Sequence, residues 1–128
     1  MPRYDAEVAA AFDITDALMF AFNEGDLDLF NSTFNFPAVR VLANGVMKID
    51  QAEDHPPAMF DRSGLPDWDH SAWERREVVH AGPDKVHLAT RFSRYRPDGS
   101  AIDGYESLYV ITRQNGRWGV KMRSSFAP

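Results

Sequence analysis

The 128-residue sequence contains no cysteine, which excludes disulfide bonds and metal sites built on thiolates. It also lacks an excess of positive charge, since 14 basic and 19 acidic side chains give a net charge of −5. A nucleic-acid-binding face normally needs clustered Lys and Arg, so this balance argues against such a partner. No hydrophobic run approaches membrane-spanning length, and the N-terminal stretch MPRYDAEVAAAF lacks the apolar core of a signal peptide. We therefore expect a cytoplasmic protein that binds neither nucleic acid nor membrane.

The hydrophobic content and the length of the sequence indicate a packed globular protein. Hydrophobic residues make up 44% of the sequence and aromatic residues 12%, which is enough for a substantial core. The length fits one domain covering residues 1–128, and no internal repeat or linker divides it. The four histidines show no spacing typical of metal ligands, and no motif indicates a cofactor. We expect neither a metal nor a cofactor.

Helices are predicted in the first half of the chain. Residues 5–24 carry apolar side chains at helical spacing, with Asp5 as a candidate N-cap and Gly25 as a candidate C-cap. Asp26 is a candidate cap for a second helix over residues 27–34. A third helix is expected between Asp50 and Ser63, with a start complicated by His55-Pro56-Pro57.

Strands dominate the second half. A short hairpin is predicted over residues 38–49 around Asn44-Gly45. Four long strands follow over residues 68–80, 85–96, 104–114 and 117–126. Helices followed by a long antiparallel meander indicate an α+β fold.

Two turns are sharp enough to predict strand pairing. A two-residue turn at Asn115-Gly116 would pair Gln114 with Arg117 and bring together Tyr109 and Met122, Ser107 and Ser124, and Leu108 and Arg123. A two-residue turn at Asp98-Gly99 would likewise predict five pairs. They are Val86 with Ile111, Leu88 with Tyr109, Thr90 with Ser107, Phe92 with Tyr105, and Arg94 with Asp103. The apolar faces of the two hairpins then coincide, although each register comes from its own turn. The facing of Trp73 to Arg76 stays open, because the loop after His80 is ambiguous.

The predicted sheet has two unequal faces. The first face is aromatic and aliphatic, and it is suited to form one wall of a ligand pocket, with residues from the first half of the chain forming the rest. The residues expected to line this pocket are Phe36, Met59, Phe60, Thr90, Phe92, Tyr105, Ser107, Tyr109, Trp118, Met122 and Ser124. The second mixes apolar and charged side chains, as a homodimer interface does; its expected residues are His87, Ala89, Arg91, Glu106, Leu108, Val110 and Arg123.

The order of these elements resembles the nuclear transport factor 2-like superfamily. The resemblance covers nearly the whole chain and is carried by AFNEGDLDLFNSTFNFPAVRV, the following hairpin, short helix and four strands, and the closing GRW with a Ser near the end. It implies a cone-shaped α+β domain in which N-terminal helices pack on a strongly curved, mostly antiparallel sheet. The superfamily includes ketosteroid isomerase, SnoaL-like polyketide cyclases, scytalone dehydratase and limonene epoxide hydrolase. It also implies a pocket on the concave face and, commonly, subunit pairing through the convex face.

The catalytic residues of ketosteroid isomerase do not carry over. The carboxylate base that precedes the proline after the second helix is replaced by Phe36. The positions expected for the tyrosine of the first helix and the acid of the late strands hold Leu18 and Leu108. These three departures argue against isomerase chemistry at that site.

Other candidate groups have both a functional and a structural interpretation. His55 beside Asp54 is a candidate catalytic or ligand-binding residue, because His with a carboxylate transfers protons; the alternative is a surface role at a helix start. Arg94 and Asp103 form a predicted rim pair that either orients a polar substrate or is a simple salt bridge.

Two functions remain open. The first is a small-molecule pocket protein whose ligand is apolar or amphipathic, with lyase, isomerase or cyclase chemistry on a hydrophobic substrate as its enzymatic form. The second is a non-catalytic dimeric binding or interaction module.

Overall fold

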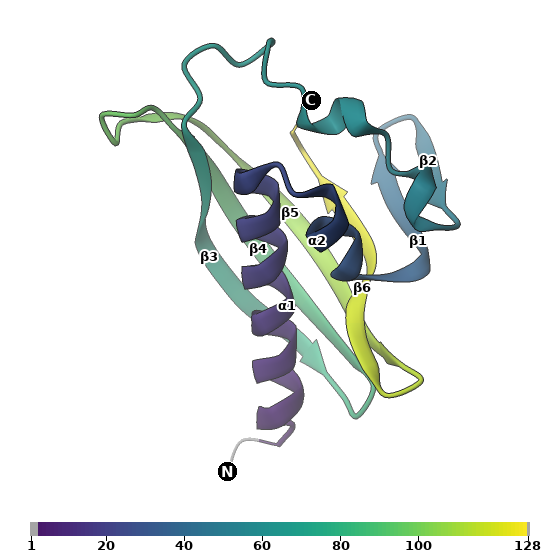
Figure 1. Ribbon diagram of the computed structural model, residues 1–128. Helices are drawn as coiled ribbons and strands as arrows, with labels where there is room; N and C mark the ends of the chain where they lie inside the picture. The colour runs from purple at the N-terminus through teal and green to yellow at the C-terminus, as the bar shows by residue number, and fades with distance from the viewer. Residues whose placement is uncertain (1–2, 128) are drawn as a thin grey trace.

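The computed structural model describes residues 3–127, apart from the side chains of residues 57 and 58, and shows helices packed on one face of a single sheet (Figure 1). The helices are α1 (Asp5–Glu24) and α2 (Leu27–Ser32). The strands are β1 (Phe34–Leu42), β2 (Gly45–Ile49), β3 (His70–Ala81), β4 (Lys85–Tyr95), β5 (Ala101–Gln114) and β6 (Arg117–Ser125). The α+β prediction is confirmed.

Both helices lie where local signals predict them. α1 has Tyr4 as its N-cap, and Asp5 instead lies in the first turn, where its negative charge favours the positive end of the helix dipole. Gly25, at φ 67°, is the left-handed C-cap that was predicted. Asp26 caps α2 by accepting a 3.0 Å hydrogen bond from the Leu29 N–H, and α2 ends at Ser32, two residues early. Within residues 3–127, no helix is long and apolar enough to cross a membrane.

The predicted third helix is wrong. Two short 3-10 turns, η1 (Ala52–Asp54) and η2 (Pro57–Phe60), replace it. His55 between them is extended, with φ −75° and ψ 114°, because a residue before proline is sterically kept from the helical region. Consecutive prolines also remove two N–H donors that a continuous helix needs.

The strand order in the sheet is β2-β1-β6-β5-β4-β3, and the β1–β6 pair is parallel while the others are antiparallel. The first hairpin turns one residue earlier than predicted: Leu42 pairs with Gly45, so Ala43 and Asn44 form the turn. The parallel β1–β6 pair joins the hairpin to the last strand of the chain. It was not foreseen from the sequence.

The β4–β5 register is confirmed at every predicted pair, including Leu88 with Tyr109 and Arg94 with Asp103. An irregularity near the turn pairs Tyr95 with Ala101, and it does not disturb the pairs beyond. One face of these strands therefore carries buried Val86, Leu88 and Ile111, as their alternation predicts.

The β5–β6 register is confirmed only near its turn. Ile111 pairs with Val120, but Val110 then pairs with Met122, so Lys121 is an extra residue in β6. Such a bulge reverses the facing of every later residue in the strand. The predicted partners of Arg123, Met122 and Ser124 are therefore wrong. The actual pairs are Tyr109 with Arg123, Leu108 with Ser124, and Ser107 with Ser125.

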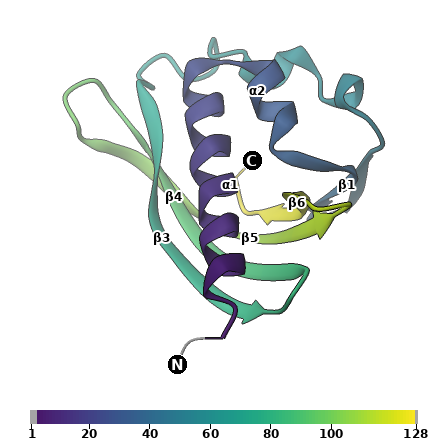
Figure 2. The same cartoon turned by 60° about the horizontal axis from the view of Figure 1, so that its bottom comes forward.

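The sheet bends around α1, as Figure 2 shows, and α1 and α2 cover its inner face. The α1 residues that are fully buried, Ala11, Thr15, Leu18 and Ala21, recur every three or four positions. On β3, whose facing the sequence does not predict, Trp73 packs inward while Arg75 faces outward. This arrangement leaves α1, α2 and the inner sheet face to define the interior.

Candidate functional site

A cavity of about 80 Å³, here called the helix cavity, lies between α1, α2 and the inner face of the sheet. Leu18 and Phe22 face it together because they are four residues apart on α1. Its lining is mainly apolar and consists of Leu18, Met19, Phe22, Phe30, Ser71, Trp73, Phe92, Tyr109 and Arg123. An apolar cavity with a few polar groups is the usual form of a small-ligand site.

Hydrogen bonds hold the walls of the helix cavity. The Asn23 side chain bonds both backbone groups of Ser71, donating to its carbonyl at 2.7 Å and accepting from its N–H at 2.8 Å. The indole of Trp68 donates to the Ser71 hydroxyl at 3.0 Å, and that of Trp73 donates to the Thr15 carbonyl at 2.9 Å. The end of α1 is thereby tied to β3.

A second cavity of about 50 Å³, the hairpin cavity, lies between the β1–β2 hairpin and the segment around His55. Ala38, Arg40, Met47 and Ile49 face it because they are cross-strand partners on the inner side of the hairpin. Its full lining is Phe34, Ala38, Val39, Arg40, Met47, Ile49, His55, Pro56, Met59 and Arg123. Arg123 lines both cavities.

His55 is buried, with 5% of its surface exposed, and three phenylalanine rings surround it. Its Nδ1–H donates to the side-chain oxygen of Asn31 at 2.6 Å, which leaves Nε2 without a proton. Burial, followed by the positive charge of Arg123, lowers the pKa of His55 to about 4, against an opposing effect of Asp54. His55 is therefore neutral at pH 7.

The His55–Asp54 dyad that adjacency suggested is not formed. The Asp54 carboxylate accepts from the Asp50 N–H at 3.1 Å, and the His55 ring bonds Asn31 instead. Adjacent residues in a tight turn point in different directions, so neighbours in sequence do not share a proton here.

Three polar side chains form a row across three neighbouring strands. In the registers of the sheet, Arg40 of β1 is opposite Arg123 of β6, and Arg123 is opposite Tyr109 of β5. Residues directly opposite each other share a face, and adjacent strands lie about 4.8 Å apart. The row therefore runs along the inner face from the hairpin cavity to the helix cavity.

Positive charge is concentrated in this row. Burial lowers the pKa of Arg40, the nearby charge of Arg123 lowers it further, and the Tyr109 hydroxyl has the opposite effect. The Nε atom of Arg40 is buried and has no hydrogen-bond partner among the described residues. The row therefore places positive charge on the inner face, at the walls of the two cavities.

Of the predicted pocket residues, Phe92 and Tyr109 line the helix cavity and Met59 lines the hairpin cavity. Met122 and Ser124 are turned to the outer face by the bulge at Lys121, so their predicted placement is wrong. The other predicted pocket residues lie on neither cavity wall: Phe36, Phe60, Thr90, Tyr105, Ser107 and Trp118.

Several of these side chains have structural partners instead. Thr90 and Ser107, both buried, hydrogen-bond each other at 2.9 Å. Phe36 packs beside His55, and Phe60 packs on Phe22 and Phe30. Trp118 packs against the edge of the core. The polar pair on the inner face is thus satisfied within the protein.

The predicted rim pair is present. Arg94 donates to Asp103 through two nitrogens, one at 2.6 Å from Oδ1, and also to the Tyr105 hydroxyl at 3.1 Å. These bonds with Asp103 raise the pKa of Arg94, and the same bonds lower the pKa of Asp103. The pair and Tyr105 form a closed polar cluster beside Phe92.

Six of the seven predicted interface residues lie in the expected β4 and β5 positions of the outer face: His87, Ala89, Arg91, Glu106, Leu108 and Val110. Their charges pair within the chain, because Arg75 bonds Glu106 at 2.8 Å and Arg91 bonds Glu74 at 3.0 Å. The seventh, Arg123, is on the inner face, so its assignment to the interface is corrected.

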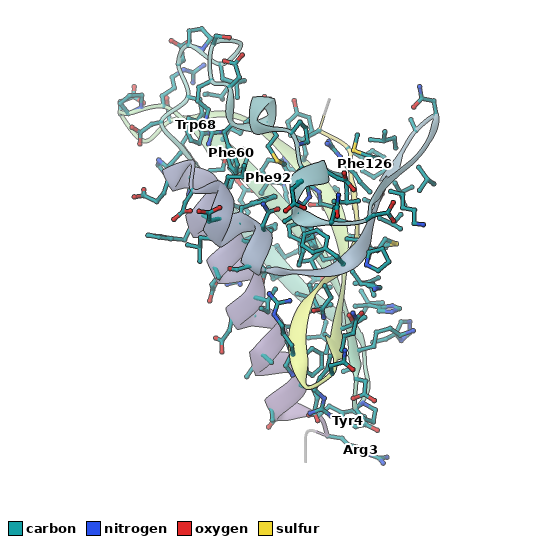
Figure 3. The ribbon with its side chains drawn as sticks, turned by 45° about the vertical axis from the view of Figure 1, so that its right-hand side comes forward. Arg3, Tyr4, Phe60, Trp68, Phe92 and Phe126 are labelled. Atoms are coloured by element: carbon teal, nitrogen blue, oxygen red, sulfur yellow. The ribbon has the colours of Figure 1, made fainter. Side chains whose placement is uncertain are left out.

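A cluster of aromatic rings around Arg62 adjoins Phe22, one of the lining residues of the helix cavity. Arg62 stacks over the rings of Phe22, Phe60 and Trp68, with its guanidinium carbon 4.2 Å from the Trp68 ring centroid, and it donates to the Phe22 carbonyl. Figure 3 shows Trp68, Phe60 and Phe92 gathered beyond the C-terminal end of α1, with Phe126 apart from them.

Sequence reasoning missed the contribution of α1 to the cavity and the role of Arg40. The helical spacing of apolar side chains over residues 5–24 predicted a buried face of α1, but it gave no sign that packing would leave space beside Leu18, Met19 and Phe22. Arg40 carried a usable signal, because it stands two residues after Ala38 and therefore lies on the same face of the strand. Gly119, two residues before Lys121, is a signal for the bulge, because an isolated glycine within a strand often marks a bulge or a close approach of backbones.

Comparisons with known proteins agree on the fold. No curated protein matches the sequence. A protein of unknown function with a cystatin-like fold from Nostoc punctiforme superposes with a TM-score of 0.77 at 10% identity, over 98% of this chain and 93% of that one.

Two further solved structures have stated roles. A hexachlorocyclohexane dehydrochlorinase LinA-type3 from Novosphingobium barchaimii has a TM-score of 0.69 at 13% identity, over 94% of this chain and 85% of that one. The association domain of Caenorhabditis elegans CaMKII has a TM-score of 0.67 at 17% identity, over 94% and 95%. At these identities the likeness shows the fold alone.

A family model covers most of the sequence. Residues 9–122 match the family described as NTF2-like protein (DUF6841). The match begins within α1 and extends through the sheet to Met122, so it includes the Lys121 bulge and ends one residue before Arg123. Together with the helix-on-sheet architecture, it establishes that this chain belongs to that family of the nuclear transport factor 2-like superfamily.

Proposed function

We propose that this protein binds a small, largely apolar ligand in the helix cavity. The observation that carries the proposal is that nine side chains from α1, α2 and four strands surround a space of about 80 Å³ that they do not fill. Protein interiors are otherwise close-packed, and an unfilled apolar space loses dispersion contacts that a ligand would restore. The volume suits a compact ligand rather than a drug-sized one.

The chemistry of the lining favours binding over proton-transfer catalysis. Among the residues that line the two cavities there is no carboxylate, and the histidine present, His55, has a pKa of about 4. A general base works best when its pKa lies near the working pH. The dehydrochlorinase activity of the similar structure is therefore not transferred to this chain.

The test is a cavity-filling substitution with a matched control on the same helix. Met19→Trp extends a lining residue into the helix cavity, whereas Phe20→Trp alters the next residue, which is 59% exposed. Benzyl alcohol and 1-hexanol serve as neutral probes in thermal unfolding and calorimetric titration. We expect both probes to stabilise the wild type and Phe20→Trp, and to leave Met19→Trp unchanged. Failure of both probes to bind the wild type would contradict the proposal.

We also propose that the outer face pairs two copies of the chain, as the predicted interface requires. Leu108 is exposed among ion pairs that are already satisfied within the chain. Apolar side chains framed by satisfied charges are typical of subunit contacts. The association domain among the similar structures supports the idea that this fold can self-associate.

A further inference from the structure

Arg40 and Arg123 stand apart from the other arginines of the sheet, because neither forms an ion pair or a side-chain hydrogen bond within residues 3–127. The remaining sheet arginines have clear partners. Arg75, Arg76, Arg91, Arg94 and Arg113 pair with carboxylates, and Arg117 donates to a backbone carbonyl.

The arrangement of the two free guanidinium groups is unfavourable by itself. They are opposite each other on adjacent strands, and both are partly buried. Like charges repel, and a buried donor without a partner loses the hydrogen bonds it made with water. Burial and the charge of Arg123 both lower the pKa of Arg40, which is the expected sign of an unbalanced positive site. An anion between them would relieve both effects.

We propose that Arg40 and Arg123 bind the carboxylate of a small apolar acid whose hydrocarbon part lies in the helix cavity. The inference rests on the proposed ligand-binding function, and it specifies further that the ligand is negatively charged. Arg123 links the two regions because it lines both cavities. Guanidinium groups bind carboxylates through paired, charge-assisted hydrogen bonds.

The lining of the helix cavity favours a ligand that has one anionic group attached to an apolar hydrocarbon part. The helix cavity contains one charged side chain, Arg123, and its other walls are aromatic or aliphatic apart from the hydroxyls of Ser71 and Tyr109. Tyr109 is the next member of the row after Arg123, and its phenol is close enough to Arg40 to affect the pKa of that arginine. It supplies a further donor at the same place.

The first experiment compares acids with their neutral isosteres. Benzoate and phenylacetate, and their amides benzamide and phenylacetamide, are titrated into the full chain at low ionic strength by calorimetry. We expect the wild type to bind the acids at least tenfold more tightly than the amides, and Arg123→Gln to lose this preference. Lys48→Gln is the matched charge control, because Lys48 is exposed on β2 and lines neither cavity.

A second variant separates ligand binding from a structural role. Arg40→Met removes the unpartnered buried donor and keeps an apolar chain of similar length. We expect its ligand-free thermal midpoint to rise by a few degrees while its affinity for benzoate falls at least fivefold. A lower midpoint would overturn the inference, because Arg40 would then stabilise the fold.

The outcomes distinguish this inference from the proposed function. If amides bind as tightly as acids, or if Arg123→Gln keeps the preference, the carboxylate site is wrong and the apolar pocket stands. If inorganic sulfate binds as tightly as benzoate, the ligand class is wrong. If the acids, the amides and benzyl alcohol all fail to bind, both proposals fall.

Discussion

His55 and Arg123 are two polar side chains of the interior that differ in charge. Both are polar side chains brought against an apolar lining, and they respond differently. His55 stays neutral, with one hydrogen bond to Asn31 and aromatic rings around it. Arg123 brings a positive charge to the same lining, and that charge lowers the pKa values of both Arg40 and His55.

The depressed pKa of His55 predicts acid destabilisation. Its pKa is about 4 in the folded protein and about 6.5 when unfolded, so the unfolded chain binds a proton more tightly. The contribution of this residue to stability is therefore complete above about pH 6.5 and is lost as the pH falls towards 4. We expect a loss of at most about 3 kcal/mol in the free energy of unfolding.

Urea unfolding between pH 4 and 7 measures this effect. His55→Gln keeps a group that can bond Asn31 but does not titrate, so its stability should fall less steeply than that of the wild type. His87, whose pKa is also lowered by burial, is present in both proteins and cancels in the comparison. Equal slopes for the two proteins would show that His55 is not the titrating group.

At the scale of elements, the contact between β1 and β6 decides the shape of the interior. Gly119 of β6 lies so close to the start of β1 that an added Cβ would stand 2.8 Å from the Asn35 nitrogen. The Asn35 side chain donates to the carbonyls of Thr112 and Arg117, at 2.9 and 3.0 Å. Gly119 and Asn35 thus fix the close approach of β6 to β1 at the start of the parallel pair.

This close approach predicts that Gly119→Ala is destabilising. The added methyl meets backbone atoms of Phe34 and Asn35 that cannot move aside without shifting β1, so we expect a loss of about 1–3 kcal/mol. Gly82→Ala is the control, because its Cβ would meet the Lys85 carbonyl oxygen at an ordinary 3.8 Å. Chemical denaturation of both variants measures the difference, and equal stabilities would refute the packing argument.

Local signals predicted the elements well and the site only in part. The Asp98-Gly99 turn was enough to assign the β4–β5 register, because each strand follows directly from a short turn. The same reasoning failed halfway along β6, where a bulge separates Val120 from Met122. The turn at Asn115-Gly116 has no influence beyond that point, so Arg123 could not be placed from it.

For the molecule as a whole, the proposed dimer makes a specific prediction. Leu108 is 38% exposed at the centre of the outer face, so Leu108→Arg should fold normally and disrupt pairing by burying an unpaired charge. We expect a shift from dimer to monomer by size-exclusion chromatography with light scattering. Val46→Arg on β2 is the control, since Val46 is exposed outside the predicted interface. A wild-type monomer, or an unchanged Leu108→Arg dimer, would contradict the assignment.

The sequence by itself determined the order of the two helices and six strands, the limits of α1, the β4–β5 register and the separation of an apolar inner face from a charged outer one. These depend on residue types, on periodicity and on contacts near in sequence. Only the tertiary structure decided that Arg123 faces inward, opposite Arg40, and that His55 bonds Asn31 rather than pairing with Asp54. The physical reason is that strand facing has a period of two, so one extra residue, Lys121, reverses it. That bulge lies where β6 meets a strand from the other half of the chain.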